Sequence, residues 1–558
     1  MALDVQRADR PQSPGPAAPV RARQLPSWTV LALAPALAAG LSLYQLTGRS
    51  LGFDEGATVA IVSQHGSALL AAIAHDGGNM SGWYLLLHLL VGVFGNGLIV
   101  LRLLSALAMI ATVALIGLVA DRLFGRPAAV AAGLLAAVSL PLVYWAQTAR
   151  GYAAMVAFAC AAMLAFVYLA DPREGETPGR GAWIAYAVSM TLAMYCSFVA
   201  VLLVPAQLLV LARRPQALRC LASALSAVAV LCIPLVVLAV SRGSGQLFWV
   251  PRPNSEQETQ VLQSLTSAGL SPVFHHQAGT YVLMWSTVAL FVAAALYELW
   301  RARRGAGSWG AALVLGWCAL PAALTFLWSF VGQPIFVPRN LLPSTPALAL
   351  VLVPPLLAGF DAVLGKRARR SPTLATKGLH MTHNVARVTA APWRGRVLGA
   401  AGVAALVALI VARAIPLAAS YAVSPEPWQK VTAIVLNAAR PGDCIAFYPR
   451  DARMAFAYYA GNDQRAPRSI LPAASWSAVK PYVESYATLS PAQLAGRSAG
   501  CRRMWFVSSH EGQPNGPAAA RAHRAQWFAL RAELEHRFGR APVQVYGYAS
   551  RIHVQLLG

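Results

Sequence analysis

Long hydrophobic runs alternate with short polar connections along most of the chain. The runs consist mainly of Leu, Ala and Val, and many approach the roughly 20 residues that an α-helix needs to cross a membrane. The pattern predicts about eleven membrane-spanning helices, with 10–13 as the open range because 181–212 is short for two crossings. The expected spans are 28–46, 98–120, 127–146, 150–170, 182–197, 198–212, 220–241, 280–299, 308–330, 339–360 and 397–416.

One apolar run, 81–95, is shorter than the others and is typical of a helix that lies at the membrane interface. If it does not cross, the basic connections 121–126, 213–219, 301–307 and 361–396 all lie in the cytoplasm, as the positive-inside rule requires. If it crosses, all four move outside. The charge distribution therefore predicts a multi-pass protein with a cytoplasmic N-terminus and an external C-terminus.

The pattern changes after the last apolar run, and three regions follow from it. Residues 1–27 are polar and rich in Pro and Arg, lack the features of a cleavable signal peptide, and are expected to form a disordered cytoplasmic segment. Residues 28–416 form the transmembrane module. Residues 417–558 predict an external α/β domain of a size that can bury a modest core. Its expected elements are a helix after Pro425, strands at 444–448 and 501–509, a helix at 522–538, and two strands within 542–557.

Composition supports the membrane class. Hydrophobic residues make up 57% of the 558 residues and charged residues only 12%, whereas a soluble protein is about one-quarter charged. The net charge of +24 would suit a nucleic-acid partner, but most Lys and Arg lie in the short connections between apolar runs. This placement is typical of a membrane protein that contacts anionic lipid headgroups. We therefore expect membrane lipids, and not nucleic acid, as partners.

Ionisable residues gather in the connections that are expected outside the membrane. Acidic residues are scarce, with 21 Asp and Glu against 45 Lys and Arg, yet two of them stand side by side after the first span. Carboxylates that face arginines at one membrane interface indicate a site that removes a proton while it holds an anion. The candidates are Asp54, Glu55, His75 and Asp76 in the loop 47–97, Arg150 and Tyr152 after the third span, and Arg339 and Asn340 at the start of the tenth.

Four stretches carry a combined pattern. They are GRSLGFDEGATVA (48–60), HDGGNMSGWYLLLHLLVGVFGNGLIVLRLLSAL (75–107), DRLFGRPAAVAAGLLAAVSLPLVYWAQTARGYAAMVAF (121–158) and PRNLLPSTPAL (338–348). At these residues the chain resembles the GT-C class of membrane glycosyltransferases, specifically bacterial relatives of the protein O-mannosyltransferases and the lipid A aminoarabinose transferases. One departure is that relatives commonly carry Pro-Pro or Lys-Pro before the aromatic residue of the short helix. Here the corresponding residues are Asn79, Met80, Ser81 and Gly82.

The resemblance implies a bacterial inner (plasma) membrane enzyme that takes a sugar from a polyprenyl-phosphate donor. The sugar passes to a hydroxyl acceptor on the external face with inversion, and the acceptor is a glycan, a lipid or a protein. A carboxylate must accept the hydroxyl proton, and arginines stabilise the leaving phosphate. In this interpretation Asp54 is the general base, with Glu55 as second candidate or as a support for the loop. Arg150, Tyr152 and Arg339 bind the donor phosphate.

Other interpretations of these residues remain open. Asp54 is alternatively a helix N-cap, Arg150 and Arg339 are alternatively interfacial anchors, and Tyr152 alternatively belongs to an aromatic belt. The protein as a whole is alternatively a transporter or flippase of lipid-linked glycans, or a non-catalytic cell-envelope assembly protein. Transporters usually contain internal repeats and charges near the membrane midplane. The sequence has no convincing repeat, and its charges gather at one interface, which favours the enzyme.

The external connection 242–279 supplies further residues that could line the site. Arg242, Trp249 and Arg252 are the candidates, and Phe248 with Trp249 is suited to stack on a lipid or a sugar. His275 and His276 in the same connection have no evident partner in the sequence.

Metal and cysteine chemistry add two weaker expectations. Asp54, His75 and Asp76 are weak candidates for a divalent metal site, because hard ligands spread along a loop are a weak signal. No other cofactor is expected. Cys444 and Cys501 each lie at the start of a predicted strand in the external domain. An oxidising exterior favours a disulfide between them, with free buried thiols as the alternative.

Overall fold

The computed structural model describes residues 27–170, 180–212, 214–243, 247, 249–270, 278–304, 308–358, 392–461, 463–476, 486–513, 516–547 and 551–558. Several expectations concern residues outside these ranges. They are the N-terminal segment up to residue 26, Phe248, His275, His276 and the basic connection 361–396 as far as residue 391.

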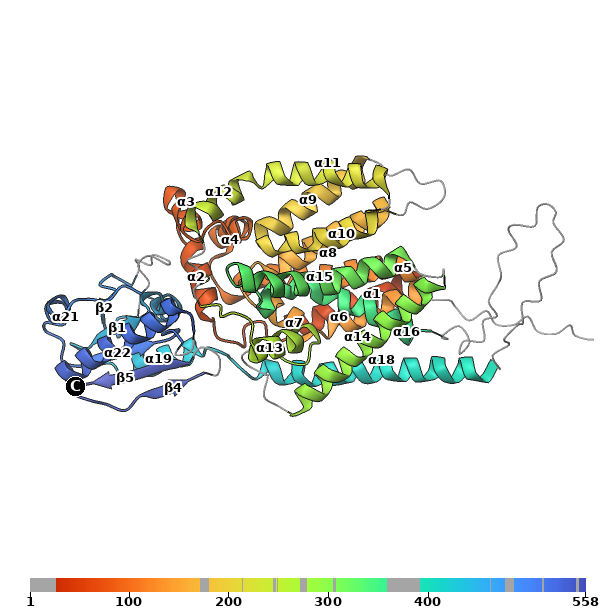
Figure 1. Ribbon diagram of the computed structural model, residues 1–558. Coiled ribbons are helices and arrows are strands. Elements are labelled where there is room, and N and C mark those ends of the chain that lie inside the picture. The colour runs from red at the N-terminus through yellow and green to blue at the C-terminus, as the bar shows by residue number, and fades with distance from the viewer. Residues whose placement is uncertain are drawn as a thin grey trace, which may run out of the picture.

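A bundle of apolar helices with roughly aligned axes forms the larger part of the molecule (Figure 1). The predicted spans fall on helical segments of this bundle, and four of them, 127–146, 198–212, 220–241 and 339–360, each comprise two elements. The bundle contains α1 (Ser27–Leu43), α5 (Leu98–Phe124), α6 (Arg126–Ala137), α7 (Leu140–Ala146), α8 (Tyr152–Ala170), α9 (Arg180–Cys196), η1 (Phe198–Leu203), α10 (Val204–Leu211), α11 (Pro215–Leu231), α12 (Ile233–Arg242), α14 (Ala278–Arg303), α15 (Trp309–Val331), α16 (Thr345–Leu356) and α18 (Pro392–Tyr421).

The helices of the bundle differ in how completely they could cross a membrane. In the described part of the chain, five are long and apolar enough to do so alone: α5, α8, α14, α15 and α18. Two bent pairs, α6 with α7 (62°) and α11 with α12 (55°), raise the number to seven if each pair is one span. Pro141 and Pro234 follow the two breaks, and a proline cannot donate a hydrogen bond to the preceding turn. The protein is a multi-pass membrane protein, and the eleven-span topology stays a prediction.

Three short helices lie at the end of the bundle nearest the C-terminal domain (Figure 1). They are α2 (Phe53–Val62), α3 (Gly66–His75) and α4 (Ser81–Phe94), all from the connection between α1 and α5. The short apolar helix expected at 81–95 is α4, which has 14 residues and begins after Met80 in a left-handed conformation. Two further short elements, α13 (Ser255–Leu265) and η3 (Pro338–Ser344), precede α14 and α16.

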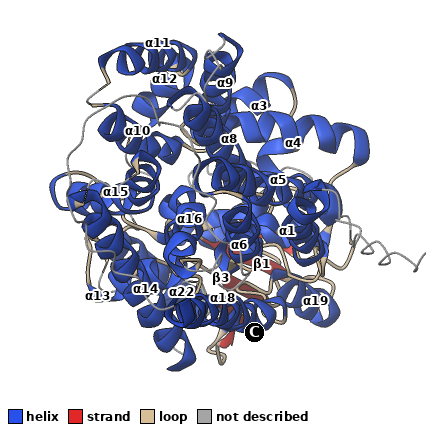
Figure 2. Cartoon of the chain, turned by 90° about the vertical axis from the view of Figure 1, so that its right-hand side faces the viewer, coloured by secondary structure: helices blue, strands red, loops and turns tan. Residues whose placement is uncertain are grey.

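The C-terminal domain contains a five-stranded sheet with the order β2-β1-β3-β5-β4, seen behind the helix bundle in Figure 2. The first three strands in this order are parallel, and β5 and β4 continue the sheet in antiparallel pairing. The strands are β1 (Cys444–Tyr448), β2 (Arg468–Leu471), β3 (Met504–Ser508), β4 (Gln544–Tyr546) and β5 (Ile552–Leu557). The four strands expected from the sequence are β1, β3, β4 and β5.

Helices cover both faces of this sheet, so each face contributes a separate core. Alternate strand residues point to opposite faces. Ile445 and Phe447 of β1 pack in one core with α19 (Trp428–Ala438) and α20 (Arg453–Ala460). Ala446 of β1 packs in the other core with α21 (Pro491–Arg497) and α22 (Ala518–Phe538). The result is a small three-layer α/β domain, in agreement with the predicted fold class.

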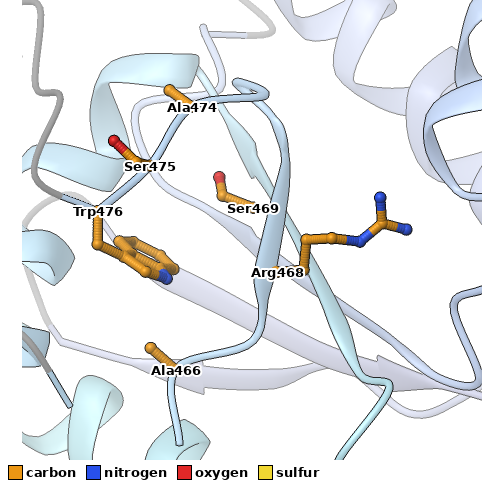
Figure 3. A pocket seen from close by; sticks show the side chains of 6 residues that line it. All are labelled: Ala466, Arg468, Ser469, Ala474, Ser475 and Trp476. Atoms are coloured by element: carbon orange, nitrogen blue, oxygen red, sulfur yellow. The ribbon is translucent and has the colours of Figure 1, made fainter. Parts of the chain in front are cut away.

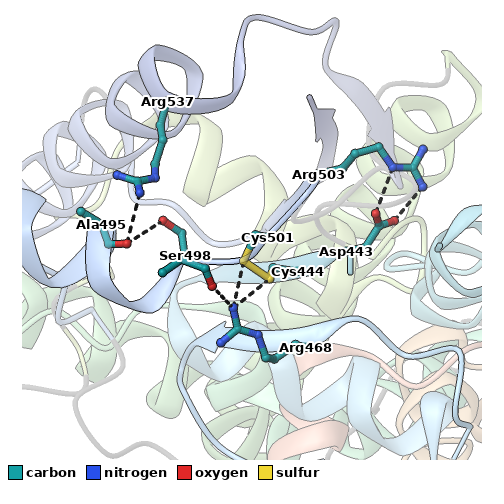
Figure 4. The surroundings of a disulfide bond; sticks show 9 residues. Asp443, Cys444, Arg468, Ala495, Ser498, Cys501, Arg503 and Arg537 are labelled. Carbon is teal, nitrogen blue, oxygen red and sulfur yellow. Dashed lines mark hydrogen bonds and ion pairs between the residues drawn. A yellow bond between two sulfur atoms is a disulfide. The ribbon is translucent and has the colours of Figure 1, made fainter. Parts of the chain in front are cut away.

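Cross-links hold together the amino ends of β1 and β3 (Figure 4). Cys444 and Cys501 form a disulfide with a Cα–Cα distance of 5.6 Å. Nη2 of Arg468 lies 3.2 Å from Sγ of Cys501. Beside them, Asp443 accepts two hydrogen bonds from Arg503, at 3.0 and 2.7 Å. These cross-links hold β1 and β3 together at their amino ends, and the carboxyl ends of the same strands lie at the opposite edge of the sheet.

The C-terminal domain docks on α2 through its helix α20. Gly56 allows this contact, because a Cβ added there would lie only 2.8 Å from the backbone nitrogen of Ala455. Leu51 N donates to the hydroxyl of Tyr459 at 2.6 Å. The hydroxyl of Tyr458 donates to the carbonyl of Asn96 at 3.0 Å. The docking brings the carboxyl ends of the parallel strands next to the start of α2.

Candidate active site

The first turn of α2 carries both neighbouring carboxylates, Asp54 and Glu55. The N-cap is Gly52, whose backbone N–H donates to Oε2 of Glu55 at 3.2 Å. Carboxylates in a first helical turn also interact favourably with the helix dipole. Asp54 is therefore not the N-cap, and the alternative in which it serves only that purpose is wrong.

Asp54 pairs with an arginine from a distant part of the chain. Its Oδ2 lies 3.2 Å from Nη1 of Arg339, which belongs to η3. The Asp54 side chain is 40% exposed and that of Arg339 is 28% exposed. The Arg339 guanidinium lies over the ring of Trp249, with its Cζ 4.6 Å from the ring centroid. The connection before α13 thus contributes Trp249 to the site, and the ion pair keeps accessible surface on both partners.

Arg150 lies behind Asp54 and is 6% exposed. Its Nη1 donates to the backbone carbonyl of Asp54 at 3.5 Å, to Oγ1 of Thr58 at 3.2 Å and to the hydroxyl of Tyr84 at 3.1 Å. That hydroxyl in turn donates to Oδ2 of Asp76 at 2.9 Å. One buried guanidinium therefore joins α2, α4 and the end of α3.

The turn that carries Arg150 is held on both sides. Gln147 donates through Nε2 to the carbonyl of Tyr44 at 2.7 Å and accepts from Nη2 of Arg49 at 2.5 Å. The carbonyl of Ala149 accepts from Nε1 of Trp83 at 3.0 Å. Buried polar groups satisfied in this way fix a segment in one conformation. Arg150 consequently projects from a rigid turn.

Glu55 occupies a closed environment on the other side of α2. Its oxygens accept from Nε and Nη2 of Arg102 at 3.0 and 2.9 Å, and the two side chains are 8% and 1% exposed. Oε1 also accepts from the backbone N–H of Ala149 at 2.8 Å. With the bond from Gly52, the carboxylate has four donors, which matches the capacity of its two oxygens. This geometry favours Glu55 as a support for the loop.

The balance between burial and nearby charge shifts the pKa in opposite directions at the two aspartates of the site. Burial opposes ionisation of Asp54, but the charges of Arg150, Arg339 and His510 outweigh it and lower its pKa. Burial raises the pKa of Asp76 to about 6, although Arg150 and the Tyr84 hydroxyl act in the other direction. At neutral pH Asp54 is therefore an ionised carboxylate with accessible surface, as a proton acceptor must be.

The remaining predicted residues lie at different distances from this centre. Tyr152 is buried, with its ring centroid 5.9 Å from Cζ of Arg150. The charge of Arg242 acts on Asp76. Asn340 makes a local bond, from Nδ2 to the carbonyl of Ile335 at 2.8 Å. Arg252 is exposed on the segment before α13. Tyr152 and Arg242 thus belong to the surroundings of the site.

The metal hypothesis gains no support from the geometry. Within the described ranges, no group of three or more His, Cys, Asp and Glu side chains could hold a metal ion. Asp54, His75 and Asp76 therefore do not form such a group. Oδ2 of Asp76 instead accepts from Tyr84.

Sequence reasoning missed several residues that shape the site. Arg102 left a signal, because a charge within an apolar run at membrane depth is costly and suggests a specific partner. The other residues are ordinary polar positions in the sequence, and only the folded structure shows that one of them, on α2 itself, and four from other segments lie around the site. They are Thr58, Tyr84, Gln147, Glu426 and His510.

A cavity of about 490 Å³ lies elsewhere, beside β2 in the C-terminal domain (Figure 3). Ala466, Arg468, Ser469, Ala474, Ser475 and Trp476 line it. The Trp476 ring packs against Phe447 and Phe456, which are core residues, and the Arg453 guanidinium lies over it at 4.7 Å. The cavity does not include any residue of the Asp54 centre.

Comparison with protein families and solved structures shows what the chain is similar to. Residues 76–241 match the family model of the dolichyl-phosphate-mannose-protein mannosyltransferases. This segment contains Asp76, Tyr84, Arg102 and Arg150. No sequence match is found among curated proteins.

Solved structures share the fold at low sequence identity. ArnT from Cupriavidus metallidurans in the apo state is 14% identical, with a TM-score of 0.52 over 95% of this chain and 98% of that chain. The apo oligosaccharyltransferase from Archaeoglobus fulgidus is 12% identical, with a TM-score of 0.53 over 88% and 70%. Archaeal AglB from the same organism, in complex with an inhibitory peptide and a dolichol-phosphate, is 13% identical, with a TM-score of 0.50 over 87% and 69%.

These matches confirm the resemblance that the sequence motifs indicated. The chain has the GT-C membrane fold of these proteins, with a small sheet domain at its C-terminus. Its segment 76–241 is related to the mannosyltransferases, while Asp54 and Arg339 lie outside the matched segment.

Proposed function

We propose that the protein is a glycosyltransferase that moves a sugar from a polyprenyl-phosphate donor to a hydroxyl acceptor. The reaction takes place on the external face of the bacterial inner membrane and inverts the anomeric carbon. The family match and the fold support the reaction class. The observation that carries the proposal is the accessible Asp54 carboxylate paired with Arg339, with Arg150 behind it.

The arrangement suits a direct displacement. The acceptor oxygen attacks the anomeric carbon of the sugar while the bond from that carbon to the phosphate oxygen breaks. The electron pair of the broken bond remains on the lipid phosphate, and the acceptor proton passes to Asp54. General base catalysis of this kind contributes roughly 10²- to 10⁴-fold.

The two arginines have different tasks in this mechanism. Arg339 is the more exposed of the two, so it is the one that contacts the leaving phosphate. Its planar guanidinium has enough donors to bind phosphate and Asp54 together. Arg150 adds positive charge from behind and holds α2 against α4 through Thr58 and Tyr84. Preorganised charges of this kind favour the transition state because they do not need to reorient.

The test is a transfer assay with the purified full chain and a panel of polyprenyl-phosphate sugars: mannose, arabinose, glucose and an amino sugar. Lipid, glycan and protein fractions of the bacterial envelope serve as acceptors. We expect Asp54→Asn to lower kcat roughly 10²- to 10⁴-fold with only a small fall in the unfolding temperature, because it keeps the shape of the side chain but removes the base and its partly exposed ion pair with Arg339.

The matched control is Asp121→Asn. Asp121 lies in the last turn of α5, at the end of the helix away from Arg102, and its substitution should leave transfer unchanged. Full activity in Asp54→Asn would show that Asp54 is not the general base. Absence of transfer by the wild type from every donor would refute the proposed function.

A further inference from the structure

The carboxyl end of β3 points toward the start of α2. His510 follows β3 by two residues, and its ring packs on Phe53, with 4.4 Å between the ring centroids. Phe53 directly precedes Asp54 in the sequence. In open α/β sheets, ligands bind beyond the carboxyl ends of the parallel strands. A residue of the C-terminal domain thus reaches the Asp54 centre from the edge where such sheets bind ligands.

Glu426 connects His510 to the backbone of α2. Its Oε1 lies 3.5 Å from Nε2 of His510, and its Oε2 accepts from the backbone N–H of Phe53 at 2.5 Å. Oε2 also lies 3.2 Å from Nε1 of Trp428. One carboxylate from the C-terminal domain therefore holds the start of the helix that carries Asp54 and lies beside the imidazole.

The backbone at His510 adopts a conformation that side chains disfavour. Its φ is +59°, in the left-handed region, which costs on the order of 1 kcal/mol for a residue other than Gly, Asn or Asp. Nδ1 lies 2.9 Å from Oγ of Ser509, and the carbonyl accepts from the hydroxyl of Tyr486 at 3.2 Å. Such strain concentrates at functional positions, and in this conformation the imidazole packs on Phe53 at the start of α2.

His510 remains partly open to solvent in this position. Its side chain is 30% exposed, compared with 40% for Asp54. The charge of His510 also contributes to the lowered pKa of Asp54, so the two side chains share one electrostatic environment. A buried structural histidine would have no such accessible surface. His510 can therefore meet a molecule that also meets Asp54.

We propose that His510 binds the acceptor through Nε2, which lies 3.5 Å from Glu426, beyond the usual hydrogen-bond distance, and donates to an oxygen beside the hydroxyl that Asp54 deprotonates. The C-terminal domain then supplies the acceptor side of the site, while Arg339 and Arg150 supply the donor side. The proton of the reacting hydroxyl still goes to Asp54. This inference rests on the proposed glycosyltransferase function and adds a residue that determines acceptor affinity.

His510→Asn is the principal test, because Asn tolerates the left-handed backbone conformation better than other residues with a side chain. The probes are the polyprenyl-phosphate sugar and the envelope fraction that the wild type uses. We expect the acceptor KM to rise about tenfold, with the donor KM and kcat changed less than about threefold, as for loss of one hydrogen bond to the acceptor. His510→Gly, which relieves the backbone strain, should show the same split even if Asn disturbs folding.

The matched control is His536→Asn, an exposed histidine on α22, which should leave both KM values unchanged. An unchanged acceptor KM in His510→Asn and His510→Gly, with an active wild type, overturns this inference alone. An equal rise of both KM values, or a fall in kcat with unchanged KM, also overturns it, because it indicates a structural role. A wild type that transfers no sugar overturns the proposed function and this inference with it.

Discussion

Asp54 and Glu55 are sequence neighbours on α2, and each pairs with an arginine, but the two pairs have different surroundings. The Glu55–Arg102 pair is 8% and 1% exposed and has two parallel contacts, whereas Asp54–Arg339 is 40% and 28% exposed and has one. Successive residues of a helix point about 100° apart, so neighbours can face different environments. A rotation of about 100° within the first turn of α2 therefore separates the buried pair from the accessible one.

The difference in exposure separates a pair that holds α2 in position from a pair that is open to a substrate. Arg102 also donates to the carbonyls of Leu46, Arg49 and Ser50, so the buried pair fixes the first turn of α2 to the chain that leads into it. A carboxylate with this many donors has no free position for an acceptor hydroxyl. Asp54 has the lone pairs and the exposure that Glu55 lacks. The buried pair holds α2 in place, and the accessible pair is available for reaction.

Arg102→Ala is the substitution from which we expect the largest effect, a loss of stability of the folded protein. It leaves Glu55 as a buried carboxylate without its counter-charge, and such changes typically cost about 3–5 kcal/mol of unfolding free energy. We expect a large fall in the unfolding temperature of the purified full chain, measured in detergent, and poor recovery of folded protein.

Arg122→Ala is the matched control on the same helix. Arg122 lies over the ring of Tyr168 at 4.7 Å and is half-buried, so its removal should cost less than about 1 kcal/mol. Equal unfolding temperatures for the two variants would contradict the supporting role of the Glu55–Arg102 pair.

Arg339→Met tests the accessible pair. Loss of a guanidinium that contacts the leaving phosphate should lower kcat on the order of 10²-fold. The acid limb of the pH profile of kcat/KM should also move to higher pH. Asp54 acts only when ionised, and Arg339 is one of the charges that hold its pKa below the usual value.

The free energy of unfolding should depend on the ionisation of Asp54 in the same direction as the activity does, and both should fall at low pH. A carboxylate with a lowered pKa in the folded state stabilises the fold above its unfolded pKa, and this contribution is lost as pH falls through the folded pKa. Arg339→Lys is the control, because it keeps the charge near Asp54 but loses the planar fork. It should lower kcat while leaving the acid limb close to that of the wild type. An acid limb that does not move in Arg339→Met would disprove the electrostatic coupling.

The sequence predicted much of this arrangement from two simple patterns. The apolar runs located the helices, and the basic connections put Asp54, Arg150 and Arg339 in external segments, although 285 positions separate Asp54 from Arg339. Short apolar runs located β1 and β3. Because the positive-inside rule needs only the positions of the basic residues, it could assign these distant side chains to one end of the bundle.

The rest depended on packing that no local pattern encodes. Polar residues are common in a globular domain, so nothing in the sequence marks Glu426 or His510 as neighbours of α2. The contact depends on the close approach at Gly56 and on the turn after β3. The resemblance favoured Asp54 over Glu55 as the base, but the local sequence did not show their different surroundings, since both occupy the same turn and only tertiary contacts distinguish them. Arg102 was visible as a charge in an apolar run, but its partner was not.

Asp76 is a third carboxylate near α2. It is buried, as Glu55 is, and the charge of Arg150 acts on it, as on Asp54. Its pKa is raised to about 6, so the folded protein binds a proton more tightly than the unfolded chain between about pH 4 and about pH 6. Stability should therefore fall as pH rises through this window. Asp76→Asn keeps an acceptor for Tyr84 but does not titrate, so it should remove this fall.

The expected difference in pH dependence between wild type and Asp76→Asn is on the order of 2 kcal/mol, the smallest effect proposed for these pairs. Thermal unfolding of the full chain from pH 4 to pH 7 measures it, with Asp121→Asn as a control that should follow the wild type. Equal slopes for wild type and Asp76→Asn would mean that Arg150 keeps Asp76 ionised as it does Asp54. In that case burial alone would not distinguish the carboxylates around α2, and the number of donors at each oxygen would have to do so.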